Sequence, residues 1–593
     1  MIGTGPDWLL AVPPLLVVLL GTALVPFPSR RLGHALAAVT LGIVAVWTLL
    51  VPDGTGPTTT FLGLEVVLVH VDDASRLVGL ALSAFGALAV GYTYLVGTDD
   101  RHLLIALAYV GTSLWTVFVG DWLGLALGWE LMAVASTLLV WYCGGEAVRA
   151  GYRYALVHAV GGGLLLVGVA LHWVAVGPSA TALQYDGTGI SSGLPALAVG
   201  LAVGVNAALI GVHVWLPRTY AAPHVGTSVI LSAYTTKVAV YAAYRAFPDG
   251  NLALATVGAA MTVYGAAYAL AQKDMRKLLA YHIQAQVGYM LAGIGLGSAL
   301  GVAGGFGHLF NNVLYKGLLF MIAGFVVVRT GKDKLDDVGA LGRATPLLFV
   351  TFLVAALSIT GVPGFNGFVT KGMVLDAAAE ADATLLEALL LAGAVGTFVS
   401  FMKFGYYAFL EGERASIPDL SPADLAVSAP IAVACVLLGI FYPALFAILP
   451  ATDAWSTDPY STAHLYKAVV LAGGSLVAFV VAKPLFGRVA GGRDVDTVRD
   501  PFVFRGTRAL TGALERAFAR TDGWVVRAGW WTVAAVRNPG ATIAAALPAS
   551  LESRYRDRLE RTPGKSGLKT SVGTTVALAF AALAVALVVA ITF

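Results

Sequence analysis

Long apolar segments follow one another from residue 8 to residue 483, and short polar stretches separate them. About twenty apolar residues cross the hydrocarbon of a bilayer, and on that template the pattern predicts about sixteen membrane-spanning helices. We therefore expect an all-α polytopic membrane protein. The predicted spans are 8–27, 33–51, 74–97, 103–119, 121–142, 152–175, 194–215, 224–246, 251–271, 277–299, 302–328, 346–376, 384–410, 424–450, 464–483 and 570–593.

Composition supports a chain that lies mostly in lipid. Only 12% of the 593 residues are charged, about half the share of a soluble protein. The net charge of +3 and the lack of a basic stripe argue against a nucleic-acid partner. The two cysteines, Cys143 and Cys435, are far apart and form no CxxC motif, so we expect no thiolate metal centre and no bound cofactor.

The loops alternate in charge. Those after the second, sixth, eighth, twelfth and fourteenth spans contain no Lys or Arg, whereas the alternate loops carry them. The positive-inside rule then predicts that the basic loops face the cytoplasm of a prokaryotic cell and that both termini face outwards. The basic positions are Arg30, Arg31, Arg101, Arg149, Arg153, Lys273, Arg276, Lys277, Arg329, Lys332, Lys334, Arg343 and Arg414.

Two segments differ from this pattern. Residues 61–71 are too short to span, and their alternation predicts a short strand or a re-entrant piece on the outer face. Residues 485–568 are rich in Arg with scattered Trp, which predicts an amphipathic helix on the cytoplasmic surface before a last span.

Pro and Gly interrupt the apolar pattern twice. One interruption covers 215–223, between the seventh and eighth spans, and the other covers 361–367 in the twelfth. They lie about 145 residues apart, as an internal repeat would place them. Broken helices at membrane depth occur beside water-filled cavities, and paired breaks in two halves indicate an ion path near the midplane. We therefore expect two inverted repeats with one broken helix each.

Charged side chains inside the predicted spans are the main candidates for function. Glu130, Lys237, His308 and Lys371 each lie in such a segment. A charge at the bilayer centre costs about 2.5–3.5 kcal/mol on insertion scales, so several of them on separate helices indicate a proton or ion relay.

Six segments carry a resemblance to a known family, and together they cover roughly residues 70–485. They resemble the antiporter-like subunits of respiratory complex I and of Mrp-type Na⁺/H⁺ antiporters, most closely the D subunit of the latter. The segments are GDWLGLALGWELMAVAS (120–136), VHVWLPRTYAAP (212–223), TTKVAVYAAYR (235–245), QKDMRKLLAYHIQAQVGYM (272–290), HLFNNVLYKGLLFMIAG (308–324) and SITGVPGFNGFVTKGMVLDA (358–377).

The resemblance implies a role for each buried group. Glu130 matches the essential glutamate of the family, Lys237 its lysine of the eighth helix, His308 its central histidine and Lys371 its terminal lysine. Lys316 lies eight residues after His308 on nearly the same helix face. The alternatives are a structural ion pair for Glu130, a lysine that reaches the interface for Lys237, and a hydrogen-bonded core residue for His308.

Two positions depart from the family. A second family histidine is Asn312 here, and the lysine expected nine residues before Trp215 is Asn206. In the family that lysine pairs with the equivalent of Glu130, so either the first half of the relay is rewired or pumping is weakened. His213, seven residues after Asn206, is a candidate substitute.

Other polar residues are weaker candidates. Lys403 resembles a family lysine but lies near the predicted cytoplasmic end, His158 lies in the sixth span, and Asp121 is expected to be a helix N-cap. His102, His282 and the Lys273/Arg276/Lys277 cluster are predicted near the cytoplasmic face, where they set topology or serve as entry groups.

These observations predict four regions: N-terminal spans and an external segment (1–70), a proton-translocating core (71–485), a cytoplasmic-face segment (486–569) and a last span (570–593). We expect a membrane subunit of a Na⁺/H⁺ antiporter that works with other membrane subunits, rather than a free enzyme. The alternatives are a proton-pumping subunit of a complex I-like NADH:quinone oxidoreductase or membrane-bound hydrogenase, and a scaffold that has lost transport.

Overall fold

The computed structural model describes residues 3–26, 29–412, 417–486, 495–549, 551 and 553. Helices dominate, and the first half of the chain also contains four short strands. The helices up to the first break are α1 (Pro14–Leu24), α2 (Arg30–Leu50), α3 (Asp73–Leu95), α4 (Asp100–Phe118), α5 (Trp122–Trp141), α6 (Glu146–Val176) and α7 (Leu194–Asn206). The strands are β1 (Gly54–Thr55), β2 (Thr58–Phe61), β3 (Leu64–Val67) and β4 (His70–Val71).

The remaining helices fall into a central group and a C-terminal group. The central group is α8 (Trp215–Ala221), α9 (Val225–Leu231), α10 (Thr235–Ala246), α11 (Leu252–Leu270), α12 (Met275–Leu296), α13 (Ala299–Thr330), α14 (Leu335–Val338), α15 (Pro346–Thr360), α16 (Asn366–Glu380) and α17 (Thr384–Gly405). The C-terminal group is α18 (Pro422–Ile440), α19 (Tyr442–Phe446), α20 (Thr462–Ala482), α22 (Val495–Arg537) and α23 (Pro539–Ala546).

Ten helices of the described ranges are long and apolar enough to cross a membrane, and three further apolar helices, α1, α7 and α15, are shorter. The all-α polytopic fold is therefore confirmed, but the predicted count of about sixteen spans is not. Two predicted spans are pairs of short helices, namely α9 with α10 and α15 with α16, and α8 lies between the seventh and eighth predicted spans. The predicted span 570–593 lies outside the described residues, as does Arg414.

The first helix break differs from its prediction. Residues 215–223 were expected to be broken, yet Trp215–Ala221 form α8, and the break is the preceding stretch 207–214. Pro217 is the third residue of α8, where its missing N–H has no intrahelical partner to lose. Ala208 (φ 58°) and Gly211 (φ 95°) turn the chain within the break.

Two further breaks follow. Residues 232–234 separate α9 from α10, which the sequence pattern did not predict. Residues 361–365 separate α15 from α16, as expected, and Gly361 (φ 84°) and Gly364 (φ 92°) take the left-handed conformation that glycine adopts without strain. Each break frees backbone carbonyls inside the bundle.

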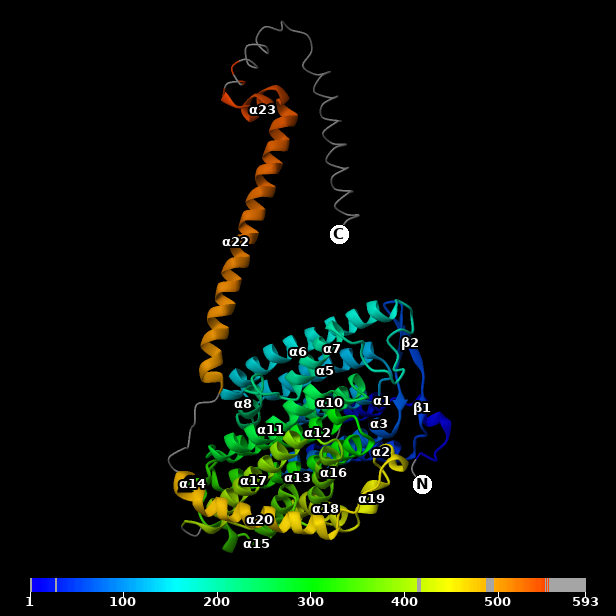
Figure 1. Cartoon of the computed structure of the whole chain (residues 1–593), viewed down its shortest axis with the longest axis vertical. Coiled ribbons are helices and arrows are strands. Elements are labelled where there is room, and N and C mark those ends of the chain that lie inside the picture. Colours follow the sequence, from blue (N-terminus) through cyan, green and yellow to red (C-terminus); the bar gives the residue numbers. More distant parts are fainter. Residues whose placement is uncertain are drawn as a thin grey trace. The chain divides into compact units, whose positions relative to one another are not determined.

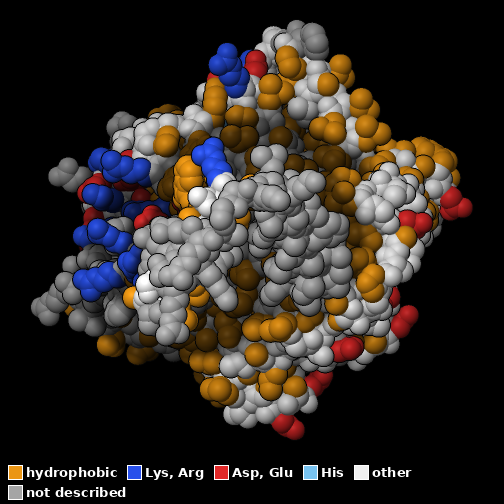
Figure 2. All heavy atoms as spheres, turned by 90° about the horizontal axis from the view of Figure 1, so that it is seen from above, with side chains coloured by type: hydrophobic (Ala, Val, Ile, Leu, Met, Phe, Trp, Pro, Cys, Tyr) orange, Lys and Arg blue, Asp and Glu red, His pale blue; other side chains and the backbone are white. Residues whose placement is uncertain are grey.

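The core lies around α12 and α13. Almost every residue of α12 and most of α13 are buried. In Figure 1, α5, α6 and α7 lie along one side of this pair, and α15, α18 and α20 along the other. The outer helices instead leave large apolar side chains exposed, among them Val160 of α6 and Val469 of α20. Figure 2 shows hydrophobic side chains spread over one face, as a surface in contact with lipid requires.

The loops form two distinct ends. At the basic end, Arg30 donates to the Thr98 carbonyl, and the backbone N–H of Met275 donates to the Asp333 carbonyl. At the other end, the backbone N–H of Gly120 donates to the Val67 carbonyl. These contacts join alternate loops of the bundle.

Two arginines at the second end are neutralised. Arg76 pairs with Asp53, and Arg245 pairs with Asp72 at 2.6 Å. These two ion pairs therefore add no net positive charge to the end that carries the hairpin.

Residues 58–67 form a β-hairpin at the end without free basic residues. β2 pairs with β3 in antiparallel register, with Thr58 opposite Val67, and β1 pairs with β4. Leu62 and Gly63 both have positive φ, the requirement of a tight two-residue turn. This confirms the strand expected within 61–71.

Residues 497 onwards form a second unit. Within it, α22 is one continuous helix, and its exposed side chains include Trp524 and Trp530. The helix expected within 485–568 is therefore present over 495–537. Its position at the membrane surface stays a prediction.

Candidate functional site

Two buried lysines are bound to carbonyl groups that helix breaks set free. Lys237 Nζ donates to the Ser232 carbonyl at 2.7 Å, in the break between α9 and α10. Lys371 Nζ donates to the Ile359 carbonyl at 2.6 Å, at the end of α15. Lys237 is fully buried and Lys371 is 5% exposed. The carbonyl end of a helix favours a cation, so each break supplies local compensation for a charge that would otherwise be costly.

Lys316 of α13 is the third buried lysine. Both Lys237 and Lys371 act on it electrostatically. Lys316 is fully buried, and its Nζ has no hydrogen-bond partner among the residues that the structure describes. A buried ammonium needs partners, so this amine must gain water or give up its proton. We call Lys237, Lys316, His308 and Lys371 the buried row, and Lys316 is the member whose charge is least compensated.

His308 connects α13 to two other helices. Its Nδ1 lies 3.1 Å from Thr370 Oγ1, and its Nε2 lies 3.1 Å from Gln286 Oε1 and 3.2 Å from the Tyr315 hydroxyl. Thr370 directly precedes Lys371 on α16. The structure therefore connects His308 to Lys371, the lysine at the break 361–365, through one threonine.

Amide side chains extend this network. Asn311 Nδ2 donates to the Asn366 carbonyl at 2.9 Å, and Asn366 Nδ2 donates to Asn311 Oδ1 at 3.1 Å. Asn312, which replaces the second family histidine, donates to the Tyr315 hydroxyl at 3.3 Å. It keeps a polar group at that position but adds no titratable one.

The expected place of His282 near the cytoplasmic face stays a prediction. The ring is fully buried two turns into α12, and Lys316 and Lys371 act on it electrostatically. Neither ring nitrogen has a hydrogen-bond partner among the described side chains. Its position four residues before Gln286, and so on the same helix face as that glutamine, could have indicated this. The ring lies 4.9 Å from that of Phe401 of α17, which in turn lies 5.9 Å from Lys316 Nζ.

Glu130 lies apart from these residues, between α5 and α6. Its side chain is half-buried, and its carboxylate rests on Gly162, where an added Cβ would be 1.6 Å from Oε1. No ion pair joins Glu130 to a cation within the described ranges. The expected pairing partner is thus missing in space as well as in sequence.

Asn206 occupies the expected lysine position. It is the last residue of α7, directly before the first break, and it is fully buried. Its Oδ1 would be 3.6 Å from a Cβ added at Gly161, the neighbour of Gly162. Neither of its amide atoms has a partner among the described residues. The glycines of α6 therefore separate Glu130 from an unsatisfied buried amide.

His213 lies within the first break, and its ring packs against Tyr264 of α11 (5.0 Å between centroids) and Tyr281 of α12 (6.1 Å). It faces the central helices through these contacts. Its predicted role as a substitute for the missing lysine stays a prediction. His158 stacks on Tyr154 at 3.8 Å and packs edge-on against Trp215.

Lys403 and Asp121 have structural partners outside the row. Lys403 Nζ donates to the carbonyls of Leu270 and Gln272, both at 2.7 Å, and so closes the end of α11. Asp121 caps α5 by accepting the Gly124 N–H at 2.6 Å, as expected. Burial raises the pKa of Asp121 to about 6.

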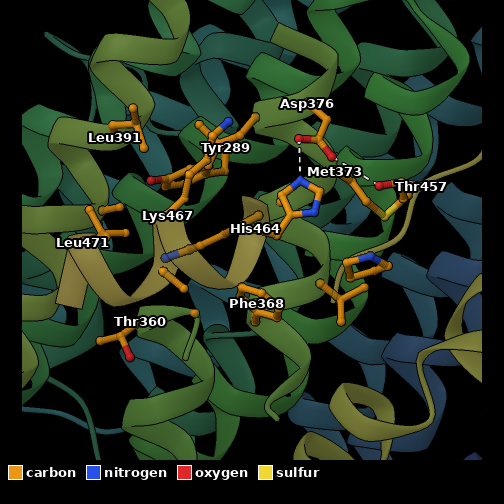
Figure 3. Close-up of a pocket in the computed structure, with 18 residues that line it drawn as sticks. Tyr289, Thr360, Phe368, Met373, Asp376, Leu391, Thr457, His464, Lys467 and Leu471 are labelled. Carbon is orange, nitrogen blue, oxygen red and sulfur yellow. Dashed lines mark hydrogen bonds and ion pairs between the residues drawn. The ribbon is translucent and has the colours of Figure 1, made fainter. Parts of the chain in front are cut away.

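A cavity of about 60 Å³ opens beside Lys371. A buried water needs roughly 10–15 Å³ of such space, so the cavity has room for several waters. Its lining includes Tyr289, Thr360, Asp376 and His464 (Figure 3). Water in this space would continue the row towards the end of α16.

Residues 119–400 match the family described as NADH:quinone oxidoreductase/Mrp antiporter, TM. An uncharacterized protein of Methanocaldococcus jannaschii is 31% identical over 349 residues, which are 55% of this chain and 71% of that protein. The chain belongs to this family. The family match covers Glu130, Lys237, Lys316 and Lys371 together.

Two further relatives of the family have descriptive names. The N subunit of an NADH-quinone oxidoreductase of Desulforudis audaxviator is 29% identical, over 64% of this chain and 81% of that protein. The D subunit of a Na(+)/H(+) antiporter of Alkalihalophilus pseudofirmus is 27% identical, over 68% of this chain and 87% of that protein.

Solved structures of the family share the fold. A chain of the Mrp complex from Dietzia sp. DQ12-45-1b superposes with a TM-score of 0.65 at 21% identity, over 80% of this chain and 99% of that chain. A chain of the archaeal membrane-bound sulfane sulfur reductase superposes with a TM-score of 0.67 at 22% identity, over 97% and 99%.

Proposed function

We propose that this chain conducts protons across the membrane as one subunit of a multisubunit monovalent cation (Na⁺)/H⁺ antiporter. The observation that carries the proposal is the buried row of Lys237, Lys316, His308 and Lys371, with a helix break at each end lysine. A merely structural core would not retain three buried lysines, because each costs several kcal/mol to keep charged without compensation.

Protonation passes along such a row through electrostatics. Two unit charges about 7 Å apart interact by roughly 2 kcal/mol at an effective dielectric near 20. A proton that arrives at Lys316 therefore weakens the hold of Lys237 and Lys371 on theirs, since all three become cations. The carbonyls of Ser232 and Ile359 hold the end lysines in place while this happens. The transmembrane potential, about 2.3 kcal/mol per charge per 100 mV, supplies the driving force.

The orientation and the surroundings of the chain are part of the proposal. The end that carries the free basic loops faces the cytoplasm of a prokaryotic cell and both termini face outwards. Residues 71–485 are the translocating core and 1–70 the N-terminal spans with the external hairpin. The proposal also includes two expectations: a segment at the cytoplasmic face over 486–569 and a last span over 570–593, the second of which lies outside the described residues. The assemblies named for the relatives support other membrane subunits as partners.

The test uses sealed membrane vesicles that contain the full chain with its native partner subunits. A pH-sensitive dye reports proton movement after a Na⁺ pulse. We expect Lys316→Ala to lower the initial rate at least about tenfold, because the middle of the row then lacks a proton carrier. Lys332→Ala, which removes an exposed cation in the loop directly after α13, is the matched control and should transport normally. Equal rates in the two variants would contradict the proposal.

The second candidate is a proton-pumping subunit of a redox complex, favoured by the similarity to the N subunit of an NADH-quinone oxidoreductase. In that case the vesicles acidify only after an electron donor and quinone are added, and a Na⁺ pulse has no effect. The third candidate, a scaffold without transport, is favoured by Asn206 and by the missing cation partner of Glu130. Proton movement under neither condition would support it.

A further inference from the structure

A carboxylate and a histidine form a pair beyond Lys371, close to the end of the molecule that carries the hairpin. His464 Nε2 of α20 lies 2.8 Å from Asp376 Oδ1 of α16, and Thr457 Oγ1 donates to the other carboxylate oxygen at 3.2 Å. Figure 3 shows both contacts on one wall of the cavity beside Lys371. About a fifth of each side chain is exposed, 18% for His464 and 20% for Asp376.

The hydrogen bonds of His464 determine how many protons the pair holds. Its Nδ1 lies 2.8 Å from the Asp458 carbonyl oxygen and 2.9 Å from Ser461 Oγ. A carbonyl oxygen only accepts, so Nδ1 must carry a proton. The 2.8 Å contact between Nε2 and Asp376 then needs a second proton between two atoms that are otherwise both acceptors. The pair therefore stores one exchangeable proton, as imidazolium with carboxylate or as imidazole with carboxylic acid.

The pair and the end of the buried row share one water-sized space. Lys371, Asp376, Thr457 and His464 all line the same cavity of about 60 Å³. Asp376 lies five residues after Lys371, nearer the end of α16 at Glu380. Solvent reaches the pair but hardly reaches Lys371, which is 5% exposed. A proton that moves between solvent and Lys371 thus meets the pair on its way.

The charges around His464 come from four elements. Asp376 and Lys371 lie on α16, and Lys467 lies one turn further along α20 and pairs with Glu387 of α17 at 3.9 Å. The Asp458 side chain, in the preceding loop, accepts the Tyr460 N–H. Lys467 and its partner are more exposed than the Asp376–His464 pair.

We propose that the Asp376–His464 pair is the port at which the relay exchanges protons with the outer solution. The inference rests on the proposed function and adds a site to it. In one cycle the pair takes one proton from outer water between Nε2 and Oδ1. That proton passes through cavity water to the unprotonated amine of Lys371, and the pair returns to imidazole and carboxylate. No other bond changes.

The test compares variants of the pair in sealed vesicles of the full complex, at fixed inner pH and varied outer pH. Asp376→Asn removes the stored proton but keeps the shape. We expect it to lower the Na⁺-driven rate at least about tenfold at neutral outer pH. Loss of a positioned acid–base group costs about 10²–10⁴-fold in rate, and the loss expected here is smaller because cavity water carries part of the flux. His464→Gln should do the same. Asp376→Glu should restore the rate to within about threefold, because it restores a carboxylate.

The pH profile separates a port from a structural contact. In Asp376→Asn the rate should lose its dependence on outer pH while its dependence on inner pH is kept, whereas a loosened fold would lower the rate at every pH. Glu380→Gln, which changes an exposed carboxylate one turn further along α16, should match the parent chain. A slow Lys371→Ala with normal Asp376→Asn and His464→Gln would overturn the port and leave the proposed function standing. Normal rates in all of them would overturn both.

Discussion

The contact between Glu130 and Gly162 gives the sharpest test of the first half of the relay. The carboxylate rests directly on the α-carbon of Gly162, so that a methyl group added there would lie 1.6 Å from Oε1. Ordinary van der Waals contact begins near 3.4 Å, and the carboxylate must therefore retreat by the difference, about 1.8 Å. Gly162→Ala thus moves the proton-carrying atoms of Glu130 without changing the residue itself.

The expected effect on function is large and the effect on folding small. A displacement of about 1 Å of a reacting group can cost about 10²-fold in rate, so we expect proton transport to fall at least about tenfold. The carboxylate is the free end of a side chain and can swing away, and alanine favours a helix by about 0.8–1.0 kcal/mol over glycine. The melting temperature of the purified complex should therefore stay the same or rise.

The assay follows Na⁺-driven proton movement in sealed vesicles together with thermal unfolding of the same preparation. Gly163→Ala is the matched control, because it gains the same helix propensity while an added Cβ meets no atom within 4 Å. If Gly162→Ala and Gly163→Ala transport equally well, the position of Glu130 does not matter for transport, and its assignment to the relay is refuted.

Three further variants test other parts of the structure. Asn206→Leu removes two unsatisfied buried amide atoms, so the free energy of unfolding should stay the same or rise by up to about 1–3 kcal/mol, measured as an unchanged or higher melting temperature. If water at this amide serves Glu130, transport should fall. Unchanged transport would remove Asn206 from the path. Burial raises the pKa of Asp274, the N-cap of α12, against the lowering effect of its hydrogen bond from the Lys277 N–H. The folded chain thus binds a proton at Asp274 more tightly than the unfolded chain does, so the free energy of unfolding falls as the pH rises through the window between the two pKa values. Asp274→Asn should therefore melt at a higher temperature than the parent chain at pH 7 and at the same temperature at pH 4. The opposite trend would contradict the raised pKa of Asp274. Lys403→Met leaves two carbonyls without their donor and should lower the free energy of unfolding by about 1–3 kcal/mol. Transport per folded complex should stay near that of the parent chain. A selective loss of transport would instead assign Lys403 to the relay.

Much of the architecture was predictable because membrane insertion makes strong demands on sequence. The lengths of the apolar segments predicted the long helices, and the basic residues distinguished one set of loops from the other. The helix breaks were less predictable. Pro217 marks a short helix rather than a break, since proline is compatible with a first helical turn, and the break between α9 and α10 contains Ser232, Ala233 and Tyr234, which carry no Pro or Gly signal.

The candidate site was predictable as a set of residues but not as a network. Family motifs identified the lysines and His308, yet the partners that orient them are neutral side chains such as Gln286 and Thr370, which look ordinary in sequence. The complete burial of His282, two turns into α12, was also not evident from the sequence, because basic residues precede it along the chain. The Asp376–His464 pair joins residues 88 positions apart, a contact that no local pattern indicates.

The two halves of the proposed relay differ in how completely their charges are compensated. Lys371 has a carbonyl partner, a hydrogen-bonded neighbour in Thr370 and a cavity that leads to a proton-storing pair. Glu130 has no cation partner among the described residues, and the position that should supply one holds a neutral amide. A carboxylate without a cation in an apolar environment favours its neutral form, so the first half would hold its proton while the second half exchanges one with solvent. On this basis the net charge of the row is set at the Lys371 end, and variants near Glu130 should change how far protons travel rather than whether they enter.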